Sequence, residues 1–253
     1  MENKSFISQT EMILLPGFNI KRLCSTEFEC INSKEAQKCI LVFGINPSGD
    51  EKDAIGEKDS KYLYYLPNIN VLERTYPNFY KPIFEIISMA TNYNAKWDWC
   101  NYREDELKEL IKIDKKLKPY SEEILEHYLE FKDNKYSIYI GEFFYYHMKS
   151  QSDFLKLVNT SNIGEHMIKL LNMHIKEIIN KGNSIELIYI NNATASHELC
   201  KALGVSEYCS STEYEYNNQM FKILFGSMLS GRRAMDSFSK ARLINEMKEH
   251  LAK

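Results

Sequence analysis

The chain has 253 residues, of which 44% are hydrophobic and 26% charged, and its formal net charge is −3. This near-average globular composition excludes wholesale disorder and fibrous repeats. No apolar run reaches the roughly 18 residues of a membrane span, and the N-terminus lacks the apolar core of a signal peptide, so we expect a cytoplasmic protein without membrane contact. The slightly acidic balance argues against a surface coated with nucleic acid, yet it leaves room for a local basic groove.

Four segments have the continuous apolar character of strands buried on both faces. They are residues 38–44, 136–141, 184–190 and 220–225. Helical periodicity occupies residues 80–91, 165–181, 197–203 and 234–251. We expect Asn191-Asn192 and Asp236 to cap the helices that follow them. Strands alternating with helices predict a parallel sheet, whose ligands bind at the carboxyl ends of the strands.

The element order predicts one three-layer α/β/α domain over residues 1–253, with a central four-stranded parallel sheet. Residues 1–37 are interpreted as an N-terminal cover. The charged segment at about 95–135 is interpreted as a helical insertion on the same domain. No internal repeat or low-complexity linker divides the chain.

Cysteine and histidine placement predicts no metal site. The six cysteines include no C-x2-C pair, which argues against a zinc ribbon or an iron–sulfur cluster, and we expect them to be small core residues. No pair among the six histidines is completed by a third ligand, and we expect His166 and His174 to be structural. We therefore expect the protein to need no metal ion and no cofactor.

The most informative stretch follows the first predicted strand, which ends at Gly44 and continues as Ile-Asn-Pro-Ser-Gly-Asp over residues 45–50. These residue types also form ordinary turns. The segment resembles motif 1 of the uracil-DNA glycosylase superfamily, in particular the Gly-Ile-Asn-Pro-Gly form of the mismatch and thymine DNA glycosylases. Residues 77–82 (PNFYKP), before an apolar helix, are similar to a segment that those enzymes place soon after motif 1.

The loop at residues 226–233 (GSMLSGRR) has the position and loop character of motif 2 in that superfamily. The order of strands, motifs and helices across roughly residues 38–251 is also that of the superfamily. The resemblance implies a uracil-DNA glycosylase-like fold. It also implies an enzyme that flips a nucleotide out of double-stranded DNA and hydrolyses its base–sugar bond, which leaves an abasic site.

The resemblance implies roles for the two motifs. Asn46 would orient the attacking water, and Asp50 would assist it, although a loop or cap role is the simpler interpretation of Asp50. The residues that would contact DNA are Ser230, Gly231, Arg232 and Arg233. The two arginines would reach phosphates or fill the gap left by the flipped base, and a solvated helix entry is their alternative.

Three departures from the family bear on the base. Ser48 stands where uracil-specific enzymes carry a tyrosine that blocks ring carbon 5, so the site would admit 5-substituted pyrimidines. Glu142 stands where they carry an asparagine; a carboxylate accepts hydrogen bonds, which suits an exocyclic amino group, and a surface acid is the alternative. Met228 stands where motif 2 begins with histidine or asparagine, and its thioether cannot donate a hydrogen bond. The residues expected around the base are Ile45, Ser48, Tyr65, Tyr76, Glu142 and Phe143.

These features predict a monofunctional DNA glycosylase for a modified pyrimidine, including the hypermodified cytosines of phage DNA, with an antiviral use. One alternative is a uracil or mismatch glycosylase of base excision repair, and another is a non-catalytic binder of modified DNA. A nucleotide-binding enzyme of the doubly wound type is disfavoured, because neither G-x-G-x-x-G nor G-x-x-x-x-G-K-[ST] follows the first strand.

Overall fold

The computed structural model describes residues 29–30, 37–45, 81–91, 136–144, 148, 150–157, 163–229 and 234–251. The elements in chain order are β1 (Glu29–Cys30), β2 (Lys38–Gly44), α3 (Lys81–Thr91), β3 (Tyr136–Glu142), α6 (Gln151–Leu157), α7 (Ile163–Asn180), β4 (Ser184–Ile190), α8 (Ala193–Ala202), β5 (Ser211–Tyr216), β6 (Gln219–Phe225) and α9 (Ser237–Leu251). The predicted α/β class is confirmed. The insertion predicted at about 95–135 lies outside the described residues.

The strands form one six-stranded sheet in the order β1-β3-β2-β4-β6-β5. The four inner strands are parallel and correspond to the four predicted ones. The predicted four-stranded sheet is nevertheless wrong in strand number, because β1 pairs antiparallel with β3 and β5 pairs antiparallel with β6. β1 lies within residues 1–37, the predicted N-terminal cover. β5 lies half exposed at the sheet edge, so it lacks the apolar run that identifies an inner strand.

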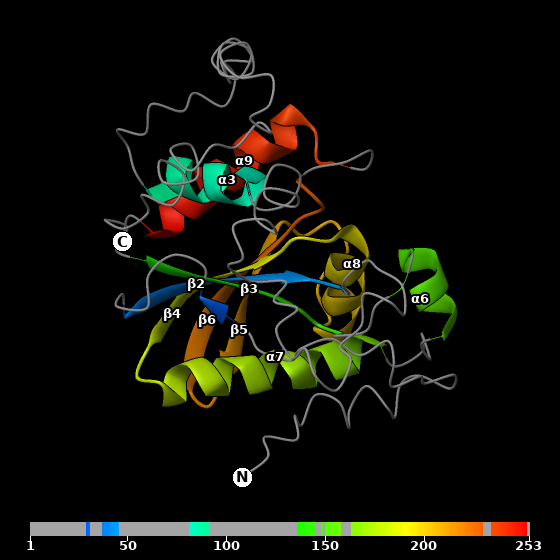
Figure 1. Ribbon diagram of the computed structural model, residues 1–253, viewed down its shortest axis with the longest axis horizontal. Coiled ribbons are helices and arrows are strands. Elements are labelled where there is room, and N and C mark those ends of the chain that lie inside the picture. Colours follow the sequence, from blue (N-terminus) through cyan, green and yellow to red (C-terminus); the bar gives the residue numbers. More distant parts are fainter. Residues whose placement is uncertain are drawn as a thin grey trace, which may run out of the picture.

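The inner strands are apolar because helices cover both faces of the sheet. β3 is buried at every position, and β2 is buried from Cys39 onward. α3 and α9 lie on one face and α7 lies on the other, so the described elements form three layers (Figure 1). α7 turns a stripe of buried side chains toward the sheet at helical spacing. These include Met167, Leu170, Leu171, Ile175 and Ile178. No described helix is both long and apolar enough to cross a bilayer.

Side-chain caps set the starts of two helices. The Asn192 side chain accepts a hydrogen bond from the Ala195 N–H at 3.0 Å, and α8 therefore begins at Ala193 rather than at residue 197. The Asp236 carboxylate accepts a hydrogen bond from the Ser239 N–H at 3.0 Å just before α9. Both results confirm the predicted caps.

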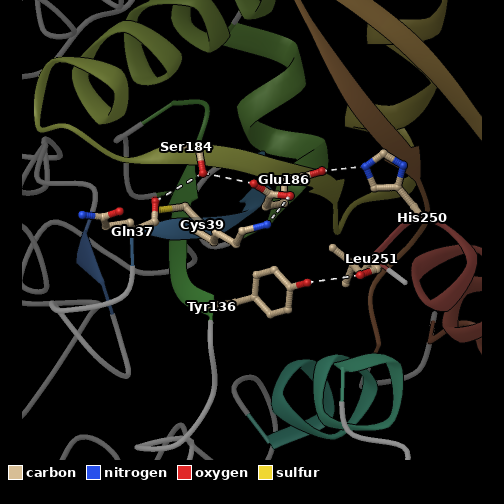
Figure 2. A network of polar contacts seen from close by, with 8 residues as sticks. Gln37, Cys39, Tyr136, Ser184, Glu186, His250 and Leu251 are labelled. Carbon is tan, nitrogen blue, oxygen red and sulfur yellow. Dashed lines mark hydrogen bonds and ion pairs between the residues drawn. The ribbon is translucent and has the colours of Figure 1, made fainter. Parts of the chain in front are cut away.

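A polar network at the amino ends of the parallel strands holds the last turn of α9 (Figure 2). The Glu186 carboxylate accepts a hydrogen bond from the Lys38 ammonium at 3.4 Å, and the Glu186 carbonyl lies 2.8 Å from His250 Nε2. The Tyr136 hydroxyl donates to the Leu251 carbonyl at 3.3 Å. The amino ends of the parallel strands thus anchor α9, and their carboxyl ends carry the candidate site.

Candidate functional site

The central strand β2 ends at the topological switch point of the sheet. β3 follows β2 in the chain and lies on one side of it. β4 follows β3 and lies on the other side of β2. Ligands of open α/β sheets bind outside the carboxyl ends of the strands at such a point. The Asn191 N–H donates to the Phe43 carbonyl at 2.7 Å, which holds the ends of β2 and β4 together.

Three of the predicted site residues lie within the described structure, namely Ile45, Glu142 and Phe143. The others fall outside the described residues. They are Asn46, Ser48, Asp50, Tyr65, Tyr76, Ser230, Gly231, Arg232 and Arg233.

Hydrogen bonds beyond β2 and β3 fix the start of the segment that resembles motif 1. The Phe143 N–H donates to the Gly44 carbonyl at 3.1 Å, and the Phe144 N–H donates to the Ile45 carbonyl at 2.9 Å. Ile45 is buried, and Phe143 is fully buried with its ring stacked on Phe43 at a centroid distance of 4.8 Å. Ile45 and Phe143 therefore belong to the core beneath the carboxyl edge.

Glu142 is buried at the end of β3, with only 4% of its surface exposed. The interpretation of Glu142 as a surface acid is therefore wrong. In the register of the sheet Glu142 is opposite Gly44, and a Cβ added to Gly44 would lie 2.6 Å from both Cδ and Oε1 of Glu142. Only glycine leaves this space open, so Gly44 allows the carboxyl group to lie directly against the backbone of β2.

Burial controls the protonation of Glu142. The pKa of the carboxyl group is raised from its ordinary value of 4.5 to about 8, because burial disfavours the charged form. Among the described residues, Oε2 has no hydrogen-bond partner. The group is mainly neutral at pH 7 and can donate as well as accept a hydrogen bond, whereas the sequence had suggested an acceptor only.

The Glu142 carboxyl group lies on the face of the sheet covered by α3 and α9. The Phe43 ring points to the other face, because its centroid is 5.3 Å from that of His174 in α7. Successive residues of a strand point to opposite faces. The position beside Gly44 therefore faces away from α7, toward the layer that contains α3 and α9 (Figure 1).

A second group of polar contacts, buried or partly buried, joins the carboxyl end of β4 and the first turn of α8 to the residues that follow β6. The Tyr189 hydroxyl donates to the Ser227 carbonyl at 3.0 Å and lies 3.4 Å from Asn191 Oδ1. The Ser196 hydroxyl donates to the Gly226 carbonyl at 2.7 Å and accepts from the Gly226 N–H at 3.1 Å. No local sequence pattern predicts these contacts, although a tyrosine inside an apolar strand run is a signal for a buried hydroxyl that needs a partner.

These contacts hold the base of the loop that resembles motif 2. The Met235 N–H donates to the Met228 carbonyl at 2.8 Å, so the two described ends of the loop meet. A Cβ at Gly226 would lie 2.7 Å from the Tyr189 hydroxyl oxygen and 2.9 Å from Met235 Cε, which explains why the chain has glycine there. The loop thus leaves the sheet from a fixed position next to the end of β4.

Within the described ranges, no three His, Cys, Asp or Glu side chains are grouped so that they could hold a metal ion. His174 is buried, and its pKa is lowered to about 3 by burial and, to a smaller extent, by the charge of Lys181. This neutral, packed ring fits the predicted structural role. Cys39 and Cys200 are buried, as predicted, whereas Cys209 is only partly buried.

No protein-family model and no curated protein matches this chain. A functional proposal therefore depends on the residues of the two segments that resemble superfamily motifs, and on how the described side chains are arranged at the carboxyl ends of the strands.

Proposed function

We propose that the protein is a DNA glycosylase that flips out a 5-substituted pyrimidine and hydrolyses the bond between base and sugar. The observation that most supports this proposal is the position of the segment that resembles motif 1. This segment begins at Ile45, directly after the central strand and beside the switch point. In this proposal the described sheet is a uracil-DNA glycosylase-like sheet, extended by the antiparallel strands β1 and β5.

The proposed chemistry depends on placement rather than on a strong base. The amide of Asn46 orients a water molecule but takes up protons poorly, so the base must depart early and leave an oxocarbenium-like sugar. Electrostatic support and positioning then supply most of the rate enhancement. Ser48 leaves room at ring carbon 5, which favours a modified pyrimidine over strict uracil specificity.

The proposed partner is duplex DNA, which the loop carrying Arg232 and Arg233 contacts. Two large apolar side chains close to these arginines in the sequence are exposed, Met228 within the loop to 38% and Phe238 at the start of α9 to 91%. Proteins that distort DNA often place apolar side chains against unstacked bases, and arginines against phosphates. The exposed pair beside a basic loop supports contact with a distorted duplex.

Replacing Asn46 by alanine tests the proposed role of motif 1. We predict that the Asn46→Ala variant forms abasic sites about 10²-fold or more slowly than the wild-type protein, because the attacking water loses its orientation. The measurement is alkali cleavage of duplexes that each contain one uracil, one mismatched thymine or one 5-substituted cytosine.

The matched control is Asn180→Ala, the same substitution at an exposed position at the end of α7. It should release bases at the wild-type rate. An Asn46→Ala variant as fast as the wild-type protein would contradict the proposed role of Asn46. Release of uracil alone would contradict the wide pocket.

A further inference from the structure

We propose that Glu142 is the general acid for a cytosine-type base, an inference that rests on the proposed glycosylase function. Its carboxyl group hydrogen-bonds the N3 edge of the flipped base and gives N3 a proton as the bond to the sugar breaks. The other carboxyl oxygen accepts a hydrogen bond from the exocyclic amino group at ring carbon 4.

The position of Glu142 is the first support. Its carboxyl group lies against Gly44, at the end of the strand that leads into motif 1. Asn46 follows Gly44 by two residues in the sequence. In the proposed site the Asn46 amide acts on the sugar side of the nucleoside and the Glu142 carboxyl group acts on the base side.

The second support is an unused hydrogen-bonding atom. Oε2 of Glu142 is buried, and no group in the described part of the chain pairs with it. Proteins seldom leave a buried polar atom without a partner, and an exception points to a ligand or a catalytic role. The edge of a flipped base would supply that partner.

The third support is the protonation state at neutral pH. Burial raises the pKa of Glu142 to about 8, and among the described residues no charged side chain is a further cause. Gly44 lies opposite Glu142 in β2, and neither Gly44 nor Ile45, which follows it, titrates. His174 lies behind Phe43 on the opposite face. General acids work best when their pKa is near the working pH.

The chemistry explains why a cytosine-type base needs this acid. When the bond between sugar C1′ and base N1 breaks, its electron pair stays on the ring. Uracil spreads this charge over two carbonyl oxygens and leaves as an anion, whereas cytosine has only one carbonyl oxygen and leaves poorly. A proton moved from Glu142 to N3 makes the departing base neutral. Water then adds to C1′, and the proton that the water loses restores the carboxyl group through solvent.

Glu142 would also supply what the motif 2 segment lacks. Met228 stands where the superfamily begins motif 2 with histidine or asparagine, and a thioether cannot donate a hydrogen bond to the leaving base. Met228 is also partly exposed at the loop base, whereas Glu142 is buried at the strand end. Leaving-group support would thus come from β3.

The test is single-turnover base release by the full-length Glu142→Gln variant. The substrates are duplexes carrying 5-hydroxymethylcytosine, its glucosylated form or uracil. Glutamine keeps a donor and an acceptor in the same shape but cannot give up a proton. We expect release of the cytosine-type base to slow by about 10²-fold or more, while binding of the same duplex changes little. The wild-type rate should fall above about pH 8, and the variant should lack this decline.

The control is Tyr136→Phe, which removes one buried hydrogen bond at the amino edge, to the Leu251 carbonyl, and should leave the rate unchanged. A Glu142→Gln variant that releases cytosine-type bases at the wild-type rate would overturn the inference while the glycosylase proposal stands. A wild-type rate that does not decline above pH 8 would also overturn it, even if the variant failed to fold. A wild-type protein that releases no base from any duplex would instead overturn the proposed function itself.

Discussion

Glu142 links the candidate chemistry to the stability of the fold. Its carboxyl group is buried against Gly44, and the folded protein holds the proton up to about pH 8. The unfolded chain loses the same proton near the ordinary pKa of 4.5. Between these two values the folded state binds more protons than the unfolded state, so the free energy of unfolding falls as the pH rises.

Thermal melting of the wild-type protein and of Glu142→Gln between pH 5 and pH 9 measures this linkage. We predict that the wild-type melting temperature falls relative to that of the variant through this range and levels off above about pH 8. The difference between the two proteins in the free energy of unfolding should change by about 1.4 kcal/mol for each unit by which the pKa of Glu142 differs between the folded and unfolded states. A difference between the two proteins that does not depend on pH would contradict the protonated, buried state of Glu142.

Single residues show which features the sequence predicts: contacts within one helix are predictable, whereas contacts between separate strands are not. Sequence indicates Glu142 because it directly follows the strand predicted at residues 136–141, but its protonation depends on burial against a glycine of another strand. The Asn192 and Asp236 caps were predictable because a cap bonds its own helix within three residues. The contact between Tyr189 and Ser227 joins separate strand ends, which no local pattern encodes.

At the scale of elements, α7 and α8 pack through a position where only glycine fits. A Cβ added to Gly164 would lie 2.5 Å from the backbone carbonyl oxygen of Glu198 and 2.7 Å from the Ala202 Cβ. The carbonyl belongs to the backbone of α8 and cannot turn aside as a flexible side chain would. This contact brings α8, the helix that follows β4, close to α7.

We predict that Gly164→Ala destabilises the protein by about 1–3 kcal/mol, even though alanine normally favours a helix by up to about 1 kcal/mol relative to glycine. The midpoint of urea unfolding measures the effect. Lys176→Ala, at an exposed position of the same helix, is the control and should change stability by less than about 0.5 kcal/mol. A more stable Gly164→Ala variant would show that the two helices do not pack this closely.

The elements differ in how far sequence predicts them. β2 and β4 have the predicted bounds because strands buried on both faces give continuous apolar runs. β5 was missed because exposed and half-buried positions alternate at the edge of the sheet. The prediction for α8 is too short at its start because the first turn, Ala-Thr-Ala-Ser, has no large apolar side chain to show helical periodicity.

At the scale of the whole molecule, the two edges of the parallel sheet have different properties. At the amino edge, contacts of Glu186 and Tyr136 satisfy polar groups and hold α9 (Figure 2). At the carboxyl edge, the described structure contains a buried carboxyl group, mainly neutral at pH 7, beside the start of the segment that resembles motif 1. The order of the elements in the sequence predicts that the site lies at the carboxyl ends of the strands, because parallel strands bring these ends together.

The most direct test of the glycosylase proposal is to incubate the wild-type protein with duplexes that each contain one candidate base. Free base is identified by mass spectrometry, and abasic sites are counted by alkali cleavage. We predict that a 5-substituted pyrimidine appears as the free base, with one alkali-labile site formed for each base released. Binding to these duplexes without release of any base would contradict the proposal and would favour a non-catalytic binder of modified DNA.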